Sequence, residues 1–158
     1  MRRYSFTLIG LVLLAGCSNK DDAVNDTVDK SQIMPMLGAV MHSNTEQVRR
    51  LAEQHIGLEE REPADQATPM IVASGSDQWP VIEILVDHGA NIWAHDQFGV
   101  TMAQMAVTSR ILSGSKEDQA RLRVIEKLKA RGYPFPPPTA EEILVLDKAG
   151  HWPPPGAR

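Results

Sequence analysis

The sequence predicts an all-α protein built from stacked helix pairs, and three observations carry this prediction. A helix start at Thr68-Pro69 is followed by a second start at Thr101, 33 residues later. Threonine suits the N-cap of a helix, and proline suits its first turn. The apolar residues of 81–86 then share one broad helical face, and Gly89 stands where a helix end favours a left-handed residue. Short helix pairs bury little surface alone, so these units must stack on neighbours.

Residues 1–16 are expected to be a secretory signal, because a basic start precedes an apolar run that closes with small residues. The run is too short for a membrane-spanning helix, which needs about 20 residues. The closing segment 14–17, Leu-Ala-Gly-Cys, resembles the lipobox of bacterial lipoproteins. That resemblance implies cleavage before Cys17 and acyl chains, palmitate among them, on this residue. The alternative is an ordinary cleaved signal with a chance cysteine. Residues 17–32 would then hold the lipidated Cys17 and a flexible polar tether.

Composition limits the classes of partner. Cys17 is the single cysteine, so the exported chain has no internal disulfide. Removing residues 1–16 takes away two arginines and no acidic residue, which moves the formal net charge from −4 to −6. This acidic balance argues against a nucleic-acid partner and against a polybasic membrane contact. The remaining 142 residues suffice for one small domain.

Repeat units are expected over residues 33–148. A degenerate first unit begins at Pro35, one period before the second. The third unit begins on time at Thr101, but Gly132 lies 43 residues after its counterpart Gly89. About ten residues are therefore inserted within 111–121, either as a functional elaboration or as a neutral loop. Ser115 is a candidate N-cap for a lengthened helix behind the insertion.

The segment after the third unit begins with a stiff, proline-rich stretch at 133–138. A capping box at 139–142 predicts a last helix that runs to about residue 148. Ile143, Leu144 and Leu146 are expected to pack this helix on the third unit. Residues 149–158 are expected to form a ragged, proline-rich tail.

The order of these signals over residues 34–146 resembles the ankyrin repeat. The resemblance implies a solenoid of about three to four helix-turn-helix units joined by hairpin loops. Where the family has the histidine of its Thr-Pro-Leu-His start, this chain has Gly38, Ile71 and Gln104. The family also implies that the hairpin tips and first helices bind other proteins and that the chain itself catalyses no reaction.

The sequence contains no recognisable catalytic signature. Ser74 and Ser76 lack the glycine spacing of a nucleophile elbow. His88 and His95 are seven residues apart across a turn, and no histidine pair has a metal-ligand spacing. We therefore predict no enzyme, and no catalytic, cofactor-binding or metal-binding residue.

Candidate protein-binding residues lie on the expected hairpins. Trp93 stands at a tip where the family has a small polar residue, so it is either a binding hot spot or a cover for a neighbouring helix. Phe98 belongs to the same candidate face, although aromatic residues there usually pack. His95 and Gln97 extend the face with polar groups. An acidic rim that would steer a basic partner is expected from the following residues: Glu59, Glu60 and Glu62.

These expectations combine into a lipid-anchored, monomeric protein of the bacterial cell envelope that binds another protein. Ser18 after the lipidated cysteine, in place of Asp, implies an outer-membrane position facing the periplasm. The sharpest version is an immunity protein or inhibitor that neutralises a toxin or lipase acting in the envelope. The alternative is a structural or assembly scaffold without an inhibitory role.

Overall fold

The structure is a computed structural model that describes residues 34–157. Over this range it contains seven α-helices and no strand. The expected signal, the lipidated Cys17 and the tether lie outside the described residues. The helices are α2 (Pro35–Met41), α3 (Thr45–Glu53), α4 (Pro69–Gly75), α5 (Trp79–Asp87), α6 (Met102–Thr108), α7 (Lys116–Ala130) and α8 (Ala140–Lys148).

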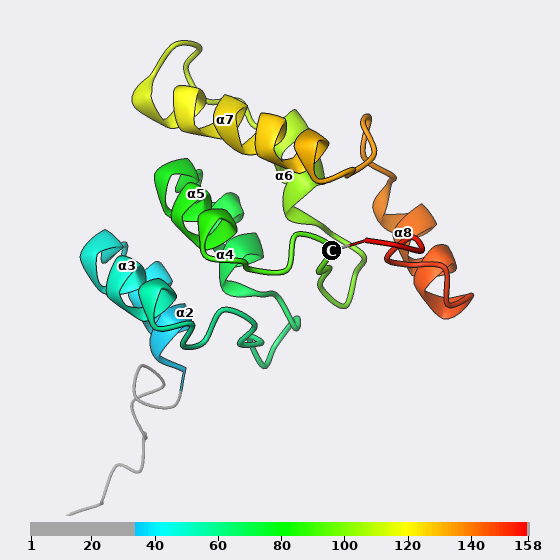
Figure 1. The fold of residues 1–158 in the computed structure, drawn as a ribbon, viewed down its shortest axis with the longest axis horizontal. Coiled ribbons are helices and arrows are strands. Elements are labelled where there is room, and N and C mark those ends of the chain that lie inside the picture. The colour runs from blue at the N-terminus through cyan, green and yellow to red at the C-terminus, as the bar shows by residue number, and fades with distance from the viewer. Residues whose placement is uncertain (1–33, 158) are drawn as a thin grey trace, which may run out of the picture.

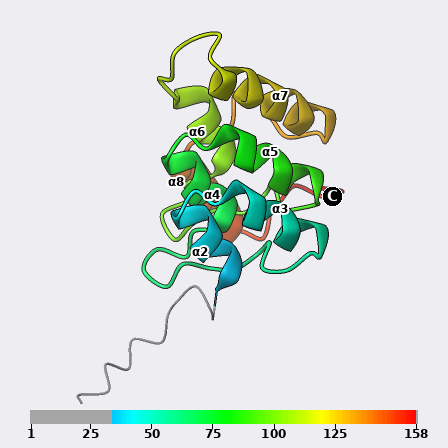
Figure 2. The same cartoon turned by 90° about the vertical axis from the view of Figure 1, so that its left-hand side faces the viewer.

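The first six helices form three pairs that lie in successive layers. Within the pairs, α2 contacts α3, α4 contacts α5, and α6 contacts α7. Between the layers, the short first helices follow one another in the order α2, α4, α6, and the second helices in the order α3, α5, α7. Figures 1 and 2 show this stacking from two directions. The predicted all-α class is confirmed for the described residues.

Local capping fixes where the helices begin. The Thr68 and Ser115 hydroxyls each accept the N–H of the residue three positions later. Thr101 and Gln104 form a reciprocal capping box, and Thr139 begins a second one at α8. Each such cap is worth about 1 kcal/mol, because it satisfies N–H groups that the helix itself leaves unpaired. The starts predicted at these residues are therefore confirmed.

An apolar core runs through the three layers. The first helices contribute small residues such as Ala73, Ala103 and Ala106, which let neighbouring backbones approach closely. The first helices, the second helices and α8 also contribute larger side chains, each worth about 1.5–3 kcal/mol when fully buried. The largest fully buried side chains are Trp79, Met36, Met70, Ile82, Leu85, Met102, Leu128 and Ile143.

The insertion lengthens the third pair. Its second helix, α7, has 15 residues where α5 has 9. Inside the α7 N-terminus, Arg121 donates to the Asp118 carboxylate and to the Ala106 carbonyl of α6. Leu112, in the loop before α7, is 79% exposed. The insertion thus forms part of a regular helix and a loop with an exposed leucine at one end of the third layer.

The C-terminal segment is an ordered part of the fold. α8 lies on the side of the hairpin loops, away from α3, α5 and α7 (Figure 1). Gln104 of α6 donates to the Pro138 carbonyl at 2.6 Å, which fixes the chain that leads into α8. Trp152 is only 8% exposed, because its ring packs into the aromatic cluster described below. The expectation of a ragged tail is therefore wrong at this residue.

Candidate functional site

The hairpin of residues 94–101 contains three of the predicted binding residues, His95, Gln97 and Phe98. Asp96 is buried, and its Oδ1 accepts the N–H groups of Phe98 and Val100, both at 2.8 Å. Gly99 closes the turn with φ +79°, which a residue with a side chain adopts only under strain. The hairpin backbone is thus held from inside by a carboxylate and presents its tip residues outward.

Phe98 is the exposed aromatic residue at this tip. Its side chain is 60% exposed, so the expectation that it packs is wrong. The physical reason is that the Asp96 carboxylate occupies the interior of the turn, which leaves Gln97 and Phe98 on the outside. A large apolar ring on a rigid turn loses little conformational entropy when a partner covers it.

Hydrogen bonds join this hairpin to the loop before α4. The Gln97 backbone N–H donates to the Asp65 carbonyl at 2.8 Å, and its side-chain amide donates to the Ala64 carbonyl at 2.9 Å. Arg61 donates to the His95 carbonyl at 2.7 Å. Consecutive hairpins are therefore fixed relative to each other. The backbone N–H and the side-chain amide of Gln97 therefore both donate to carbonyl groups of the loop before α4.

The His95 side chain connects the hairpin to α8. Its Nδ1 lies 2.7 Å from the Asp96 carbonyl, and its Nε2 lies 3.7 Å from the Asp147 carboxylate. The ring is half-buried between these two partners. His95 is therefore placed to hold α8 against the hairpin when its ring is protonated.

The three predicted acidic rim residues hold backbone groups. Glu60 accepts the N–H groups that begin α2, the shorter bond being 2.8 Å to Leu37. Glu59 accepts the Asn91 N–H at 2.6 Å, and partial burial raises the pKa of its carboxyl above the ordinary value. Glu62 accepts the N–H groups of the two residues that follow Pro63. These carboxylates anchor loops, which the sequence pattern alone did not show.

Trp93 lies in the interior of the fold. The sequence left two roles open for this residue, an exposed hot spot or a cover for a neighbouring segment, and its burial agrees with the second. It is 5% exposed and stacks on Tyr133 with ring centres 4.7 Å apart. Trp152 meets both rings edge-on, at 5.4 Å from Trp93 and 5.8 Å from Tyr133. Burial raises the pKa of Tyr133 to about 12. Trp93, Tyr133 and Trp152 are called the aromatic cluster below.

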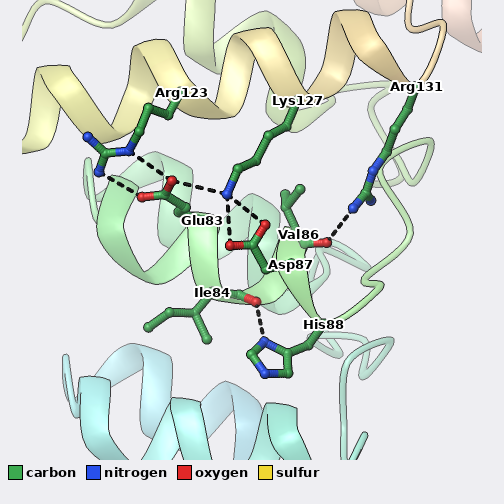
Figure 3. Close-up of polar contacts among 8 residues, drawn as sticks. All are labelled: Glu83, Ile84, Val86, Asp87, His88, Arg123, Lys127 and Arg131. Atoms are coloured by element: carbon green, nitrogen blue, oxygen red, sulfur yellow. Dashed lines mark hydrogen bonds and ion pairs between the residues drawn. The ribbon is translucent and has the colours of Figure 1, made fainter.

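A ladder of ion pairs joins the second helices of the second and third layers (Figure 3). Glu83 of α5 pairs with Arg123 at 2.7 Å and with Lys127 at 3.1 Å, and Asp87 pairs with Lys127 at 2.6 Å. The hydrogen bond from Arg123 is the main cause that lowers the pKa of Glu83 to about 2. One turn further along α7, Arg131 donates to the Val86 carbonyl in the last turn of α5 (Figure 3). This ladder is a structural fastening between layers.

The sequence contains a signal for this ladder in the spacing of its charged residues. Two acids four residues apart in α5 face three cations spaced four apart in α7, and residues at this spacing share a helix face. When the third unit is aligned with the second by Gly132 and Gly89, instead of by Thr101 and Thr68, the acidic face of α5 and the basic face of α7 come into register.

An exposed apolar surface forms where the hairpin tip meets α8. A side chain at Gly99 would collide with the Ala140 carbonyl and with Leu144, so these segments are in close contact. Leu144 is 40% exposed and packs there, where the sequence had suggested contact with the third unit. Val145 is 63% exposed on the next position of α8. Phe98, Leu144 and Val145 together are called the tip–α8 surface.

No protein-family model matches the chain, and no curated protein matches it. Within residues 34–157, no three His, Cys, Asp or Glu side chains lie so that they could hold a metal ion. None of the described helices combines the length and the apolar character needed to cross a membrane. The candidate site consists of exposed apolar side chains beside a turn that is held by internal hydrogen bonds.

Proposed function

We propose that this chain is an ankyrin-type solenoid that binds another protein. The spacing of the layers supports this reading: α4 begins at Pro69 and α6 at Met102, 33 residues apart. The hairpins between layers are joined by backbone and amide hydrogen bonds, as in repeat proteins that display a continuous binding face. A fold of this class hosts many activities, so the proposal depends on the surface itself.

The tip–α8 surface is the observation that carries the proposal. Exposed aromatic and aliphatic side chains that cluster on a rigid scaffold commonly mark a protein-binding site. Here Phe98 projects from a turn fixed by a buried carboxylate, Leu144 of α8 lies against the same turn at Gly99, and Val145 is the next, exposed residue of α8. Water is excluded from all three side chains only when a partner covers them.

The proposed setting is the bacterial envelope, with the protein held by a lipid on Cys17 at the outer membrane and facing the periplasm. The lipobox of residues 14–17 supports this part of the proposal. In the sharpest version the partner is a toxin or lipase of the envelope, and the protein neutralises it as an immunity protein. In the alternative the protein is a scaffold that holds its partner without inhibiting it.

The test is affinity capture from envelope and secreted fractions with three baits: the wild-type protein, Phe98→Ala and Leu112→Ala. Leu112 is the matched control, because it is an exposed apolar residue on a different loop. We expect one stoichiometric partner whose affinity falls at least about fivefold with Phe98→Ala, equivalent to about 1 kcal/mol, and is unchanged with Leu112→Ala. Equal capture by all three baits would refute binding through the tip–α8 surface.

Two further measurements separate the versions of the proposal. Loss of radiolabelled palmitate on Cys17→Ser would support the lipid anchor, and unchanged labelling would remove it. If the captured partner is a hydrolase, adding the protein in equimolar amount should abolish its activity for an immunity protein and leave it intact for a scaffold.

A further inference from the structure

A groove lies between the proline-rich segment and α8, next to the tip–α8 surface. Its volume is about 820 Å³, with one wall formed by Pro136–Pro138 and the other by Val145 and Leu146 of α8. The Glu141 and Glu142 side chains complete its lining. Gln104 holds the proline wall through the Pro138 carbonyl, so the groove is a fixed part of the fold.

The lining side chains accept hydrogen bonds but offer none. Proline has no backbone N–H, so the wall of Pro136–Pro138 exposes carbonyl groups and ring carbons. The one hydroxyl in the lining, that of Thr139, donates to Glu142 at 3.1 Å. An occupant that pairs with these side chains must therefore supply the donors, and it must also cover apolar carbons.

Within residues 34–157, the carboxylates at the groove are paired with no cation. The ion pairs of residues 34–157 involve neither Glu141 nor Glu142. The hydrogen bonds from Thr139 lower the pKa of Glu142, which keeps its carboxylate charged well below neutral pH. Two carboxylates thus stand beside an apolar floor, and no cation in the described part of the chain is paired with them.

We propose that this groove binds an arginine or lysine side chain of the partner protein. Such a side chain has an apolar stem, which would lie on Val145, Leu146 and the proline rings, and a donor-rich cationic head, which would reach Glu141 and Glu142. Val145 belongs both to the groove and to the tip–α8 surface. The partner segment therefore carries a basic residue next to an apolar one, which covers Phe98 and Leu144.

This inference rests on the proposed function and narrows it to a class of partner. The formal charge of −6 expected for the processed chain favours the approach of such a basic segment. Charge complementarity at the groove selects a cation over an anion, and the apolar floor selects a side chain over a bare metal ion.

The binding test uses three fluorescein-labelled peptides that differ only in the central residue: Gly-Ser-Leu-Arg-Leu-Ser-Gly, the same peptide with citrulline, and the same with glutamate. Citrulline keeps the shape of arginine without its charge. Fluorescence anisotropy with the purified full chain should show saturable binding of the arginine peptide, at least about tenfold tighter than the citrulline peptide. The glutamate peptide should not bind. Equal affinities for arginine and citrulline, or no arginine binding at about 1 mM protein, would overturn the inference.

Paired variants place the binding in the groove. Glu141→Gln should weaken the arginine peptide at least about fivefold. Glu117→Gln should leave it unchanged, because Glu117 occupies the same helical position in α7 as Glu141 does in α8. Val145→Lys should abolish binding, whereas Val107→Lys, at an exposed valine of α6, should not. Circular dichroism melts confirm that each variant is folded. If both members of a pair behave alike, the peptide binds elsewhere.

The outcome is separable from that of the proposed function. If the capture experiment yields a partner sensitive to Phe98→Ala but insensitive to Glu141→Gln and Val145→Lys, the protein-binding proposal stands and the groove inference fails. If the groove variants and Phe98→Ala release the same partner, both stand.

Discussion

Replacing Trp93 tests whether the aromatic cluster supports the fold. Trp93→Ala removes a ring that is 5% exposed and that contacts both Tyr133 and Trp152. Truncating a buried tryptophan to alanine costs about 3–5 kcal/mol, and the two ring pairs account for about 1–3 kcal/mol of that. We expect the free energy of unfolding to fall by about 4 kcal/mol, much of the roughly 5–15 kcal/mol that a domain has.

Trp93→Phe is the informative companion, because it separates the ring from its N–H group. Among the described residues the buried Trp93 Nε1 has no hydrogen-bond partner. Phenylalanine keeps the stacking and removes an unpaired donor whose burial costs about 1–3 kcal/mol. This gain offsets the loss of ring area, so we expect Trp93→Phe to lie within about 1 kcal/mol of the wild type.

The assay for both variants is urea unfolding followed by far-ultraviolet circular dichroism, with His151→Ala as a control at an exposed neighbour of the cluster. A Trp93→Ala variant within about 0.5 kcal/mol of the wild type would refute the assignment of Trp93 to the core. A Trp93→Phe variant as unstable as Trp93→Ala would show that the indole nitrogen has a partner after all.

Three further outcomes are expected. The folded-state pKa of Glu83 is about 2, below the ordinary 4.5, so its ion pairs stabilise the fold fully above about pH 5 and are lost as the pH falls toward 2. Glu83→Gln should therefore remove about 1 kcal/mol of the pH dependence of stability, measured by melting curves from pH 2 to 6. An unchanged pH dependence would contradict this prediction. Gly99→Ala should lower the free energy of unfolding by about 2–3 kcal/mol and detach α8. Gly132→Ala, with open space at its Cβ, should lower it by about 1 kcal/mol. Equal losses for the two variants in chemical denaturation would argue against a close contact at Gly99. Trp152→Phe should cost about 1 kcal/mol, since it loses the 2.8 Å bond to the Trp93 carbonyl, and a stability equal to wild type by calorimetry would rule that bond out as a contributor.

Local chemistry made much of the fold predictable. Thr68, Thr101 and Thr139 cap helices through N–H groups only three residues away, so the sequence contains every part of each interaction. The apolar face of 81–86 and the lengthened α7 follow from periodicity in the same way. The expected positions of these elements therefore agree with the structure.

The binding face was less predictable, because it depends on residues far apart in the chain. Trp93 is buried only because Tyr133 and Trp152 reach it from the C-terminal segment. Glu60 is an anchor only because α2 begins opposite it, 23 residues earlier. Phe98 is exposed because a neighbouring carboxylate fills its turn. Composition indicates aromatic and acidic surfaces, but tertiary contacts decide which side chains remain on them.

The bond from Trp152 to the Trp93 carbonyl spans 59 residues, in a fold whose other contacts join mainly adjacent layers. Stacked repeats without such a link melt from their ends, one layer after another. Here the C-terminal segment closes a loop around the third layer, so α6 and α7 cannot fray until the aromatic cluster opens. We therefore expect the second and third layers to unfold as one cooperative unit and the α2–α3 layer to open first.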